Sequence, residues 1–300
     1  MISFVFISTT ALSLNKKFLE DIIEVPKFSL LYKNFPGNPT LSENATFPTL
    51  SAQGAIAIDI DSGVPLYEKN VDAQLLPAST TKIVTALVAF DTYQLDQILK
   101  VPKVASVEGQ KMGLFVGEEM SVKDLLYGLL VYSANDAAMT LAANYPGGFD
   151  AFIAAMNNKA KDLSMVNSRF ENPVGLDGVN QTTTAKDLLR ASEVAMRNPE
   201  FAKMVGTKNI LLTDSSGKVK YNLNNINELL GNVPGVMGVK TGWTEGAREN
   251  LVTYIERDGH SVIIVVLGSQ DRFGETKELI DWIFQNYQWN EVQVSQRVNS

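Results

Sequence analysis

The stretch that decides the fold is residues 77–93, PASTTKIVTALVAFDTY. Its start, Pro77-Ala78-Ser79, is typical of a helix N-terminus. Apolar side chains then recur at helical spacing, at Ile83, Val84, Leu87, Val88 and Phe90. We therefore expect a helix that opens at this Pro-Ala-Ser, runs to about Tyr93 and buries one face.

Predicted strands lie on both sides of this helix. Before it, residues 55–60 predict a strand, residues 61–63 a turn and residues 64–68 the return strand. After it, the sequence predicts helices at 121–131, 135–144, 148–162 and 183–196, strands at 235–241, 250–257 and 260–268, and a last helix at 274–287. Strands from both ends of a chain can share one antiparallel sheet with helices on both faces. We therefore expect an α+β fold with a helical subregion, because the β–α alternation of a parallel sheet is missing.

The chain divides into three expected parts. Residues 51–288 form the folded domain, residues 1–50 hold an apolar segment and a proline-rich arm, and residues 289–300 form a polar tail. The apolar segment, residues 2–14, is shorter than the about 20 residues that span a bilayer. No basic residues precede it as they would in a signal peptide. Two interpretations stay open: a truncated signal anchor with N-terminal membrane association, and a segment packed on the domain.

Composition narrows the class of protein. Of the 300 residues, 45% are hydrophobic and 20% are charged, which is typical of a soluble protein with a sizeable core. Lysine and arginine number 26 against 33 aspartate and glutamate, giving a net charge of −7. An acidic surface repels phosphate backbones, so a nucleic-acid partner is disfavoured.

Two residue counts narrow the chemistry. Cysteine is absent, which excludes a thiol nucleophile, disulfides, cysteine-ligated zinc and iron–sulfur clusters. Histidine occurs once, at His260, in a predicted hairpin turn where a surface position is expected. A Ser-His-Asp hydrolase needs a histidine base, and zinc hydrolases normally need two or three such ligands. Any hydrolytic chemistry therefore needs a base other than histidine.

Ser79 and Lys82 form the first candidate pair. Positions i and i+3 share one face of a helix, so the hydroxyl and the amine can meet. Lysine, with a free pKa of about 10.4, becomes a base when burial or a second cation lowers its pKa. The same Ser-x-x-Lys spacing occurs at Ser13–Lys16 and Ser215–Lys218, so the pattern alone is not specific. Only Ser79 follows a strand hairpin and opens an apolar helix.

Two further motifs occur later in the chain. Ser133-Ala134-Asn135 lies between two predicted helices, where a turn can present both polar side chains; the plain alternative is a serine helix cap. Lys240-Thr241-Gly242 lies at the end of a predicted strand. Glycine there leaves the strand open to close approach by a substrate. The plain alternative is an edge strand with an exposed lysine.

Taken in this order, the three motifs resemble those of the serine penicillin-recognising enzymes. Longer matches resemble the D-alanyl-D-alanine carboxypeptidases, the low-molecular-mass penicillin-binding proteins of peptidase family S11. These matches are residues 77–86, 171–177 (ENPVGLD), 183–188 (TTAKDL), 238–244 (GVKTGWT) and 250–252 (NLV). The resemblance implies a β-lactamase/transpeptidase-like sandwich with the site between the sheet and the helical subregion.

The resemblance also implies a function. The chain would be a serine-type D-Ala-D-Ala carboxypeptidase that removes the terminal D-alanine of peptidoglycan stem peptides, outside the cytoplasmic membrane. It would bind β-lactam antibiotics and need no metal or organic cofactor. Ser79 would be the nucleophile and Lys82 its base. Ser133 would pass a proton to the leaving D-alanine, and Asn135 would hold Lys82 and the substrate.

Substrate-binding roles follow in the same way. Lys240 would keep the site electropositive, Thr241 would bind the terminal carboxylate, and Gly242 would leave room for the substrate. The backbone N–H groups of Ser79 and Trp243 would form the oxyanion hole. Arg272 follows the last predicted strand, and a guanidinium can grip a carboxylate with two hydrogen bonds, so it is a candidate second clamp. The alternative for Arg272 is a solvated turn residue.

The sequence departs from the family at two places. Trp243 stands where many members carry histidine, and residues 288–300 are too short and polar for the β-rich second domain and anchor of many members.

Other functions also stay open. A β-lactamase would carry a Glu-x-x-x-Asn loop, where this chain has Glu171-Asn172-Pro173. The motifs do not separate a carboxypeptidase from an endopeptidase, and a non-catalytic penicillin-sensing or wall-binding domain would have no use for the lysine base.

Overall fold

The computed structural model describes residues 37–103 and 107–290. The apolar segment at residues 2–14, the first part of the proline-rich arm and the tail beyond residue 290 lie outside the described residues. The strands are β1 (Pro39–Leu41), β2 (Gly54–Asp59), β3 (Pro65–Lys69), β4 (Ile98–Lys100), β5 (Glu119–Ser121), β6 (Asn209–Thr213), β7 (Lys220–Asn224), β8 (Val236–Thr244), β9 (Arg248–Arg257), β10 (His260–Ser269) and β11 (Tyr287–Trp289). The helices are η1 (Ala78–Thr81), α2 (Lys82–Thr92), α3 (Val122–Val131), α4 (Asn135–Ala143), α5 (Gly148–Asp162), α6 (Ala185–Met196), α7 (Pro199–Val205) and α8 (Arg272–Asn286).

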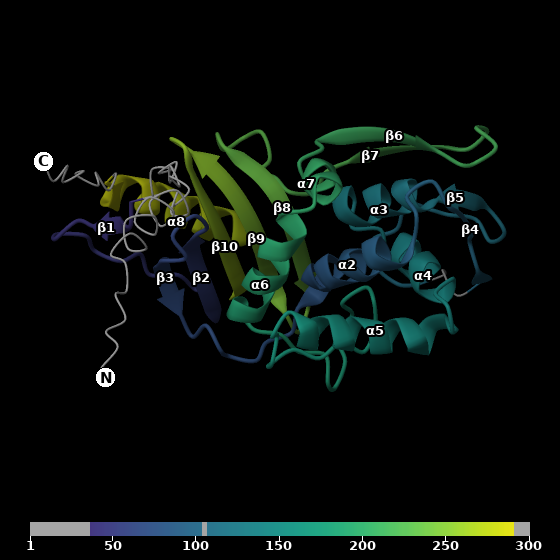
Figure 1. Ribbon diagram of the computed structural model, residues 1–300, viewed down its shortest axis with the longest axis horizontal. Coiled ribbons are helices and arrows are strands. Elements are labelled where there is room, and N and C mark those ends of the chain that lie inside the picture. Colours follow the sequence, from purple (N-terminus) through teal and green to yellow (C-terminus); the bar gives the residue numbers. More distant parts are fainter. Residues whose placement is uncertain (1–36, 104–106, 291–300) are drawn as a thin grey trace, which may run out of the picture. The chain divides into compact units, whose positions relative to one another are not determined.

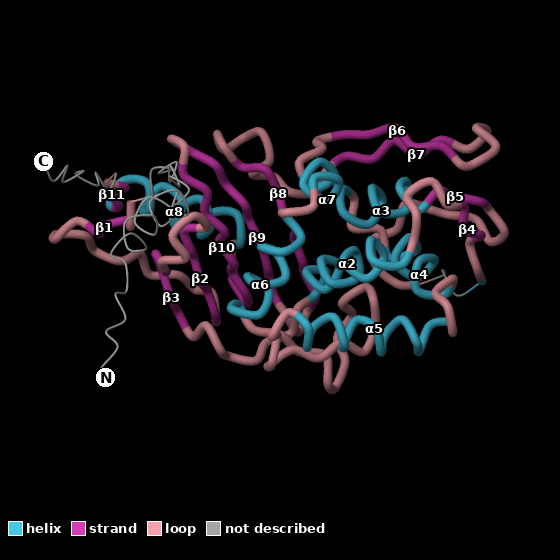
Figure 2. The backbone as a smooth tube through the Cα atoms, in the orientation of Figure 1, coloured by secondary structure: helices cyan, strands magenta, loops and turns pink. Residues whose placement is uncertain are grey.

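A five-stranded antiparallel sheet forms the centre of the domain. Its order is β3-β2-β10-β9-β8, so the N-terminal hairpin joins the three C-terminal strands, as expected (Figure 1). The register pairs Ile56 of β2 with Val265 of β10, and Val265 with Val252 of β9. Helices α2 to α7 form a block beside the sheet and come between its two groups of strands along the chain (Figure 2), whereas α8 follows β10. The expected α+β class is confirmed.

The two faces of the sheet bury two different cores. Along β10 every residue from Val262 to Leu267 is fully buried. Alternate residues point to opposite faces of a strand. Ile263, Val265 and Leu267 accordingly pack in the core that contains the helical block, whereas Val262, Ile264 and Val266 pack in the core that contains residues of α8. Helices therefore cover both faces, and β10 carries an uninterrupted apolar run.

The helical block contains elements that the sequence analysis did not predict. The chain between α6 and β8 forms the short helix α7 and the hairpin β6–β7, and β4 pairs with β5 before α3. Asn198 caps α7 by accepting hydrogen bonds from the N–H groups of Glu200 and Phe201. These elements are short, and short elements give weak periodic signals.

Residues on both sides of the expected domain pack against it. β1 pairs with β11, and the indole N–H of Trp282 in α8 donates to the carbonyl of Thr46 over 2.7 Å. Phe47 lies against the same indole, with 4.8 Å between ring centroids. Part of the proline-rich arm and the first two residues of the expected tail therefore belong to the same compact unit as the sheet.

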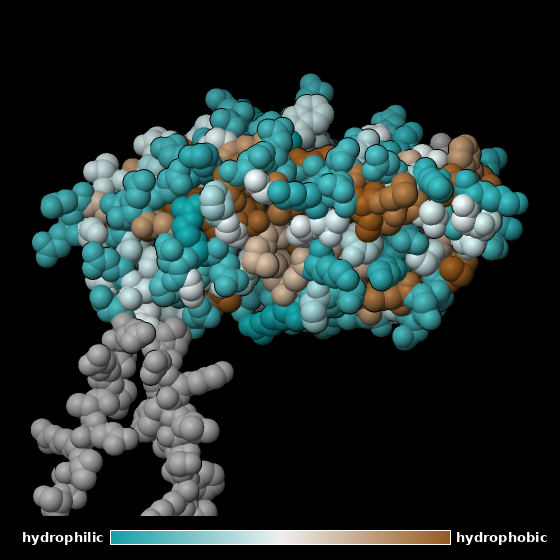
Figure 3. Space-filling model, turned by 90° about the horizontal axis from the view of Figure 1, so that it is seen from above, coloured by the Kyte–Doolittle hydropathy of each residue, from teal (hydrophilic) through white to brown (hydrophobic). Residues whose placement is uncertain are grey.

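On the face seen from above, hydrophilic residues predominate (Figure 3). Seen from above, apolar residues lie in separate patches among polar ones (Figure 3). Within residues 37–103 and 107–290, each helix is too short or too polar to cross a bilayer.

Candidate active site

The turn that carries Ser79 lies between the N-terminal hairpin and α2. Residues Ala78–Thr81 form a single 3₁₀ turn, η1, and Lys82 is the first residue of α2. The predicted helix, which opens at Pro77-Ala78-Ser79 and runs to about Tyr93, is therefore present, and its first turn is a 3₁₀ turn. Ala78 has a φ of 47°, a conformation that side chains rarely adopt. This turn leaves Ser79 half-buried at the surface of a groove, while Lys82 is fully buried.

Lys82 and Ser79 are in direct contact. Lys82 Nζ lies 2.8 Å from Ser79 Oγ and donates to the carbonyl oxygen of Val174 over 2.8 Å. Burial lowers the pKa of Lys82 well below its ordinary value; the charge of Lys240 lowers it further, and Asp136 opposes the shift. A buried lysine with a lowered pKa is a base in its neutral form. The contact predicted from the Ser-x-x-Lys spacing is therefore present.

The loop at residues 171–177 holds the carbonyl that contacts Lys82. The side-chain oxygen of Asn172 accepts hydrogen bonds from three consecutive N–H groups, those of residues 174, 175 and 176, at 3.2, 2.7 and 3.1 Å. Its amide donates back to the carbonyl of Leu176 over 2.9 Å. Asn172 thereby fixes the turn that aims the Val174 carbonyl at Lys82. A neutral amine that donates to this carbonyl keeps its lone pair free for Ser79.

The same loop is tied to the end of β8. Asp177 accepts hydrogen bonds from the hydroxyl of Thr244 over 2.6 Å and from the N–H of Gly246 over 3.2 Å. Gly175 packs so closely on η1 that a Cβ there would overlap the Ala78 carbonyl. Glu171 instead accepts from the Asn180 amide over 2.7 Å and lies outside the groove. The loop therefore braces the nucleophile turn against β8 and presents no carboxylate to Ser79.

Ser133 and Asn135 line the groove on the helical side. Ser133 has a φ of 61° and precedes α4, whose cap residue is Ala134, so the interpretation of Ser133 as a helix cap was wrong. Both side chains are nearly fully buried, at 2% and 4% exposure. Within the described part of the chain, Ser133 Oγ and Asn135 Oδ1 are buried atoms without a hydrogen-bond partner. Such atoms cost stability unless a ligand or water contacts them, which points to a binding role.

Asn135 and Asp136 fix the opposite wall of the groove. The Asn135 amide donates to the carbonyl of Glu108 over 2.6 Å. The buried carboxylate of Asp136 accepts from three consecutive backbone N–H groups, those of residues 112, 113 and 114, at 3.1, 2.8 and 3.0 Å. The segment that carries Glu108 is therefore held through its backbone.

β8 forms the other side of the site. Lys240 and Thr241 are buried, at 1% and 2% exposure, whereas Trp243 is 63% exposed. Burial and the charge of Arg272 lower the pKa of Lys240 to about 7. The interpretation of Lys240 as an exposed edge-strand lysine was therefore wrong. A Cβ on Gly242 would lie 2.9 Å from Ser79 N, so only glycine lets β8 approach the nucleophile turn this closely.

Arg272 is the first residue of α8 and reaches the same strand. Its Nη1 donates to the carbonyl of Gly242 over 3.4 Å and lies 3.7 Å from a carboxylate oxygen of Glu249. Its Nε is buried and has no hydrogen-bond partner among the described residues. Only 17% of its side chain is exposed, so the alternative of a solvated turn arginine was wrong.

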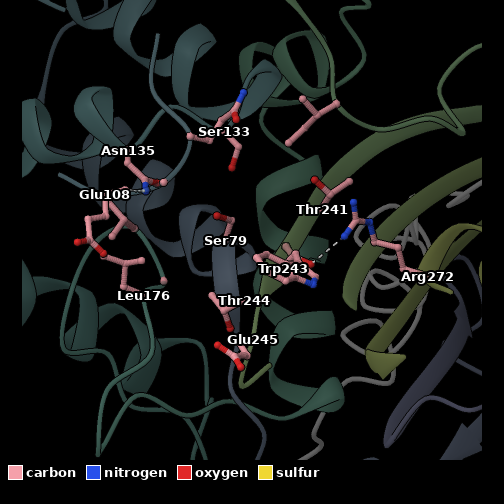
Figure 4. A pocket seen from close by; sticks show the side chains of 16 residues that line it. Ser79, Glu108, Ser133, Asn135, Leu176, Thr241, Trp243, Thr244, Glu245 and Arg272 are labelled. Atoms are coloured by element: carbon pink, nitrogen blue, oxygen red, sulfur yellow. Dashed lines mark hydrogen bonds between the residues drawn. The ribbon is translucent and has the colours of Figure 1, made fainter. Parts of the chain in front are cut away.

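These groups meet in a groove of about 600 Å³ between the sheet and the helical block. Ser79 lies at its centre, with Ser133 and Asn135 on one side and Thr241 and Trp243 on the other; Arg272 lies beyond Thr241 (Figure 4). Lys82 and Lys240 are buried in its wall. The structure thus brings together the site residues that the motifs predicted.

The other Ser-x-x-Lys matches and the single histidine do not line the groove. Ser215 and Lys218 lie in the turn of the β6–β7 hairpin, and Ser13–Lys16 lies outside the described residues. His260 begins β10, stacks on Trp289 with 4.4 Å between ring centroids, and does not line the groove. The contributions of Asn172, Asp136 and the Val174 carbonyl were missed. A backbone carbonyl has no sequence signature, although Asn172 lay within a quoted match.

Comparisons with known proteins agree with this geometry. The family model described as D-alanyl-D-alanine carboxypeptidase matches residues 41–271. The chain belongs to this family. Its match to the D-alanyl-D-alanine carboxypeptidase DacF of Bacillus subtilis is 34% identical and covers 79% of this chain and 63% of the relative. The chain thus spans less than two thirds of that relative's length.

Two further similar proteins differ from DacF in the type of reaction that their names give. A D-alanyl-D-alanine endopeptidase of Escherichia coli is 32% identical over 80% of this chain and 79% of its own length. The crystal structure of a Streptomyces DD-transpeptidase has a TM-score of 0.76 and 31% identity, and it covers 80% of this chain and 100% of its own. The predicted carboxypeptidase family and its fold are confirmed.

Proposed function

We propose that this family member removes the terminal D-alanine from D-Ala-D-Ala stem peptides through an ester on Ser79. The observation that carries the proposal is the contact between a half-buried serine and a fully buried lysine whose pKa is lowered, 2.8 Å apart. This pair supplies a nucleophile and its base without histidine. The endopeptidase relative leaves cleavage of cross-links as a second candidate, which differs only in the leaving group.

Acylation begins when Lys82 is neutral. Its lone pair takes the hydroxyl proton of Ser79 while Ser79 Oγ forms a bond to the carbonyl carbon of the penultimate D-alanine. The carbonyl oxygen becomes an anion, which the N–H groups of Ser79 and Trp243 stabilise. The C–N bond then breaks, and the proton passes from Lys82 through the Ser133 hydroxyl to the departing amine. D-alanine leaves, and an ester remains on Ser79.

The second half-reaction restores the enzyme. A water molecule attacks the ester carbonyl, and its proton goes to Lys82, which is neutral again after the first step. Ser79 Oγ leaves as the carbon–oxygen bond breaks and regains a proton from Lys82. The shortened peptide is released as a carboxylic acid. Lys82 therefore acts twice, and no other base is needed.

Binding of the substrate carboxylate is assigned to Thr241, Lys240 and Arg272. Thr241 lines the groove, and the two cations lie beside it, with Lys240 fully buried. Arg272 keeps an Nε atom without a hydrogen-bond partner in the described part of the chain. A charged hydrogen bond to a carboxylate is about twice as strong as a neutral one. These cations support recognition of a free C-terminal carboxylate and hence the carboxypeptidase over the endopeptidase.

Two alternatives have less support. A β-lactamase needs a second base to activate the deacylating water, and Glu171 lies outside the groove, bonded to Asn180. A non-catalytic binding domain does not need a buried lysine against the serine. The family's substrate class supports action on peptidoglycan, binding of β-lactam antibiotics and a location outside the cytoplasmic membrane. We also propose that the N-terminus associates with the membrane.

Release of D-alanine from a D-Ala-D-Ala peptide tests the proposal. The wild-type protein should release one D-alanine per peptide, and Ser79→Ala should release none while it stays folded by circular dichroism. A cross-linked dimer, in which the carbonyl of the penultimate D-alanine is joined to an amine of a second peptide, separates the two candidates. Faster cleavage of the cross-link than of the free terminus would favour the endopeptidase.

A further inference from the structure

The wall of the groove beside Asn135 is a stretch of backbone that Asn135 contacts twice. Residues 108–110 line the groove, and we call residues 108–114 the wall segment. The backbone N–H of Asn135 donates to the carbonyl of Gln110 over 2.7 Å. Its side-chain amide donates to the carbonyl of Glu108 over 2.6 Å (Figure 4). Asn135 is therefore tied to the wall segment through both its main chain and its side chain.

The carboxylate of Asp136 holds the other end of the wall segment. Its Oδ1 accepts hydrogen bonds from the N–H groups of residues 112 and 137 at 3.1 and 3.0 Å, and its Oδ2 accepts from residues 113 and 114 at 2.8 and 3.0 Å. Asp136 is 2% exposed and forms no salt bridge within residues 37–103 and 107–290. A buried carboxylate is costly unless hydrogen bonds replace those to water. These four bonds come from backbone N–H groups, three of them in the wall segment.

Gly109 fits the wall segment closely against the Asn135 amide. Its φ is 85°, a conformation that glycine adopts readily and other residues rarely adopt. A Cβ at this position would lie 2.8 Å from Asn135 Nδ2, which is closer than an unstrained contact allows. A larger residue would therefore push the wall segment away from the amide or turn the amide out of its present orientation.

The contact with Glu108 decides which way the Asn135 amide faces. A carbonyl oxygen only accepts hydrogen bonds, so the amide nitrogen faces the wall segment and Oδ1 faces away from it. Oδ1 is buried and has no hydrogen-bond partner among the described residues, although Asn135 lines the groove. The χ2 angle of an asparagine varies broadly when nothing restrains it. A polar group that meets the substrate already oriented needs no reorganisation during the reaction.

We propose that Asp136 and Gly109 are positioning residues for acylation, which hold the wall segment in place so that the Asn135 amide meets the ligand already oriented. The inference rests on the proposed function, because it gives Asn135 a contact with the ligand that acylates Ser79. A misplacement of about 1 Å can slow an enzyme reaction by about 10²-fold. Loss of either positioning residue should therefore slow the acylation of Ser79 by about tenfold to hundredfold.

The charge of Asp136 acts in the opposite direction to this effect. Burial and then Lys240 lower the pKa of Lys82, whereas Asp136 raises it. Removing the charge alone would leave more of Lys82 neutral and would speed acylation. In Asp136→Asn, an amide nitrogen faces two N–H donors in either orientation, because each carboxylate oxygen accepts from two. Slower acylation in this variant would therefore report the displaced wall segment.

A double-mutant cycle with Asn135→Ala tests the inference. Intact-mass analysis gives the rate at which penicillin acylates Ser79 in the wild-type protein, in Asp136→Asn, in Asn135→Ala and in the double variant. Asp136→Asn should slow the wild-type protein by about tenfold or more but should slow Asn135→Ala by less than about threefold, because the amide that it positions is then absent. Gly109→Ala should behave in the same way, since Asn135→Ala removes the atom that its Cβ would strike. A role confined to the stability of the fold would give the same loss in both backgrounds.

Two variants are matched controls. Asp150→Asn removes an exposed carboxylate from the first turn of α5, and Gly63→Ala adds a methyl group at a φ of 72° where nothing beyond its chain neighbours lies within 4 Å. Both should be acylated at the wild-type rate. A wild-type rate in folded Asp136→Asn, or equal losses with and without the Asn135 amide in either cycle, would overturn the inference. If circular dichroism shows that Asp136→Asn does not fold, the cycle with Gly109→Ala decides. Failure of the proposed function is distinguishable, because then the wild-type protein itself would form no adduct on Ser79.

Discussion

Replacing Lys240 with methionine should stabilise the protein, although it removes a residue assigned to substrate binding. Lys240 is 1% exposed, and burial and Arg272 lower its pKa from 10.5 to about 7. The unfolded chain holds this proton more tightly than the folded protein does. Protonation therefore favours unfolding, fully below about pH 7, and the effect fades as pH rises toward 10.5. Methionine abolishes this cost and keeps a long apolar side chain.

The size of the effect follows from the pKa shift. Each unit corresponds to about 1.4 kcal/mol, so the cost of Lys240 is about 4 kcal/mol at pH 7 and about 1 kcal/mol at pH 9.5. The hydrogen bond that Lys240 donates to the Thr241 carbonyl over 2.9 Å is also lost, but that loss depends little on pH. The difference between the two pH values, about 3 kcal/mol, therefore reports the buried charge of Lys240 together with its repulsion of Lys82.

Urea unfolding of the wild-type protein and Lys240→Met at both pH values measures this difference. The free energy of unfolding of the variant, relative to wild type, should be higher at pH 7 than at pH 9.5 by about 3 kcal/mol. Lys123→Met, at an exposed position of α3, should show no such dependence. A stability difference that is the same at both pH values would refute the reasoning, because it would mean that Lys240 keeps an ordinary pKa.

Three further predictions concern the reaction. Lys82→Ala should lower the rate at which penicillin acylates Ser79 by about 10²- to 10⁴-fold, measured with a fluorescent penicillin. Raising the pH should not restore the rate, because the base is missing. A loss below about tenfold would show that another group is the base. Asn172→Ala should slow acylation because the Val174 carbonyl loses its support, and Asn172→Asp, which keeps an acceptor oxygen for the three N–H groups, should recover most of the rate. Equal rates in these two variants would contradict the positioning role. A penicilloyl adduct on Ser79 should persist for minutes in mass spectra while D-alanine release from a peptide continues; rapid turnover of the adduct with the peptide intact would favour the β-lactamase.

Strong periodicity and turn residues explain why much of the fold was predictable. The uninterrupted apolar run of β10 and the Asp258-Gly259 turn before it place β9 and β10 within two residues of the expected bounds. The hairpin β6–β7 was missed because its exposed residues alternate with only three buried ones, Leu212, Tyr221 and Leu223. Tertiary contacts with the helical block, rather than a strong local pattern, stabilise such a hairpin.

The side-chain motifs were sufficient to predict the residues at the centre of the site. The backbone geometry that positions these residues was not predicted. The spacing of Ser79 and Lys82 was sufficient to predict their contact, because it follows from the geometry of one turn. The same reasoning gave a helix at Ala78, where the structure has a positive φ and a 3₁₀ turn. Gly175 and Gly242 pack on this turn from a loop and a strand far along the chain. Contacts of that kind depend on the complete fold, so no local pattern reports them.

The central claim is that Ser79 forms the covalent intermediate. Intact-mass analysis after incubation with a penicillin, followed by peptide mapping, tests it most directly. The account predicts one penicilloyl group per chain, on the peptide that contains Ser79, and no adduct on Ser79→Ala, which should remain folded. An adduct of wild-type yield on Ser79→Ala, or one mapped to Ser133 or Ser215 in the wild-type protein, would contradict it.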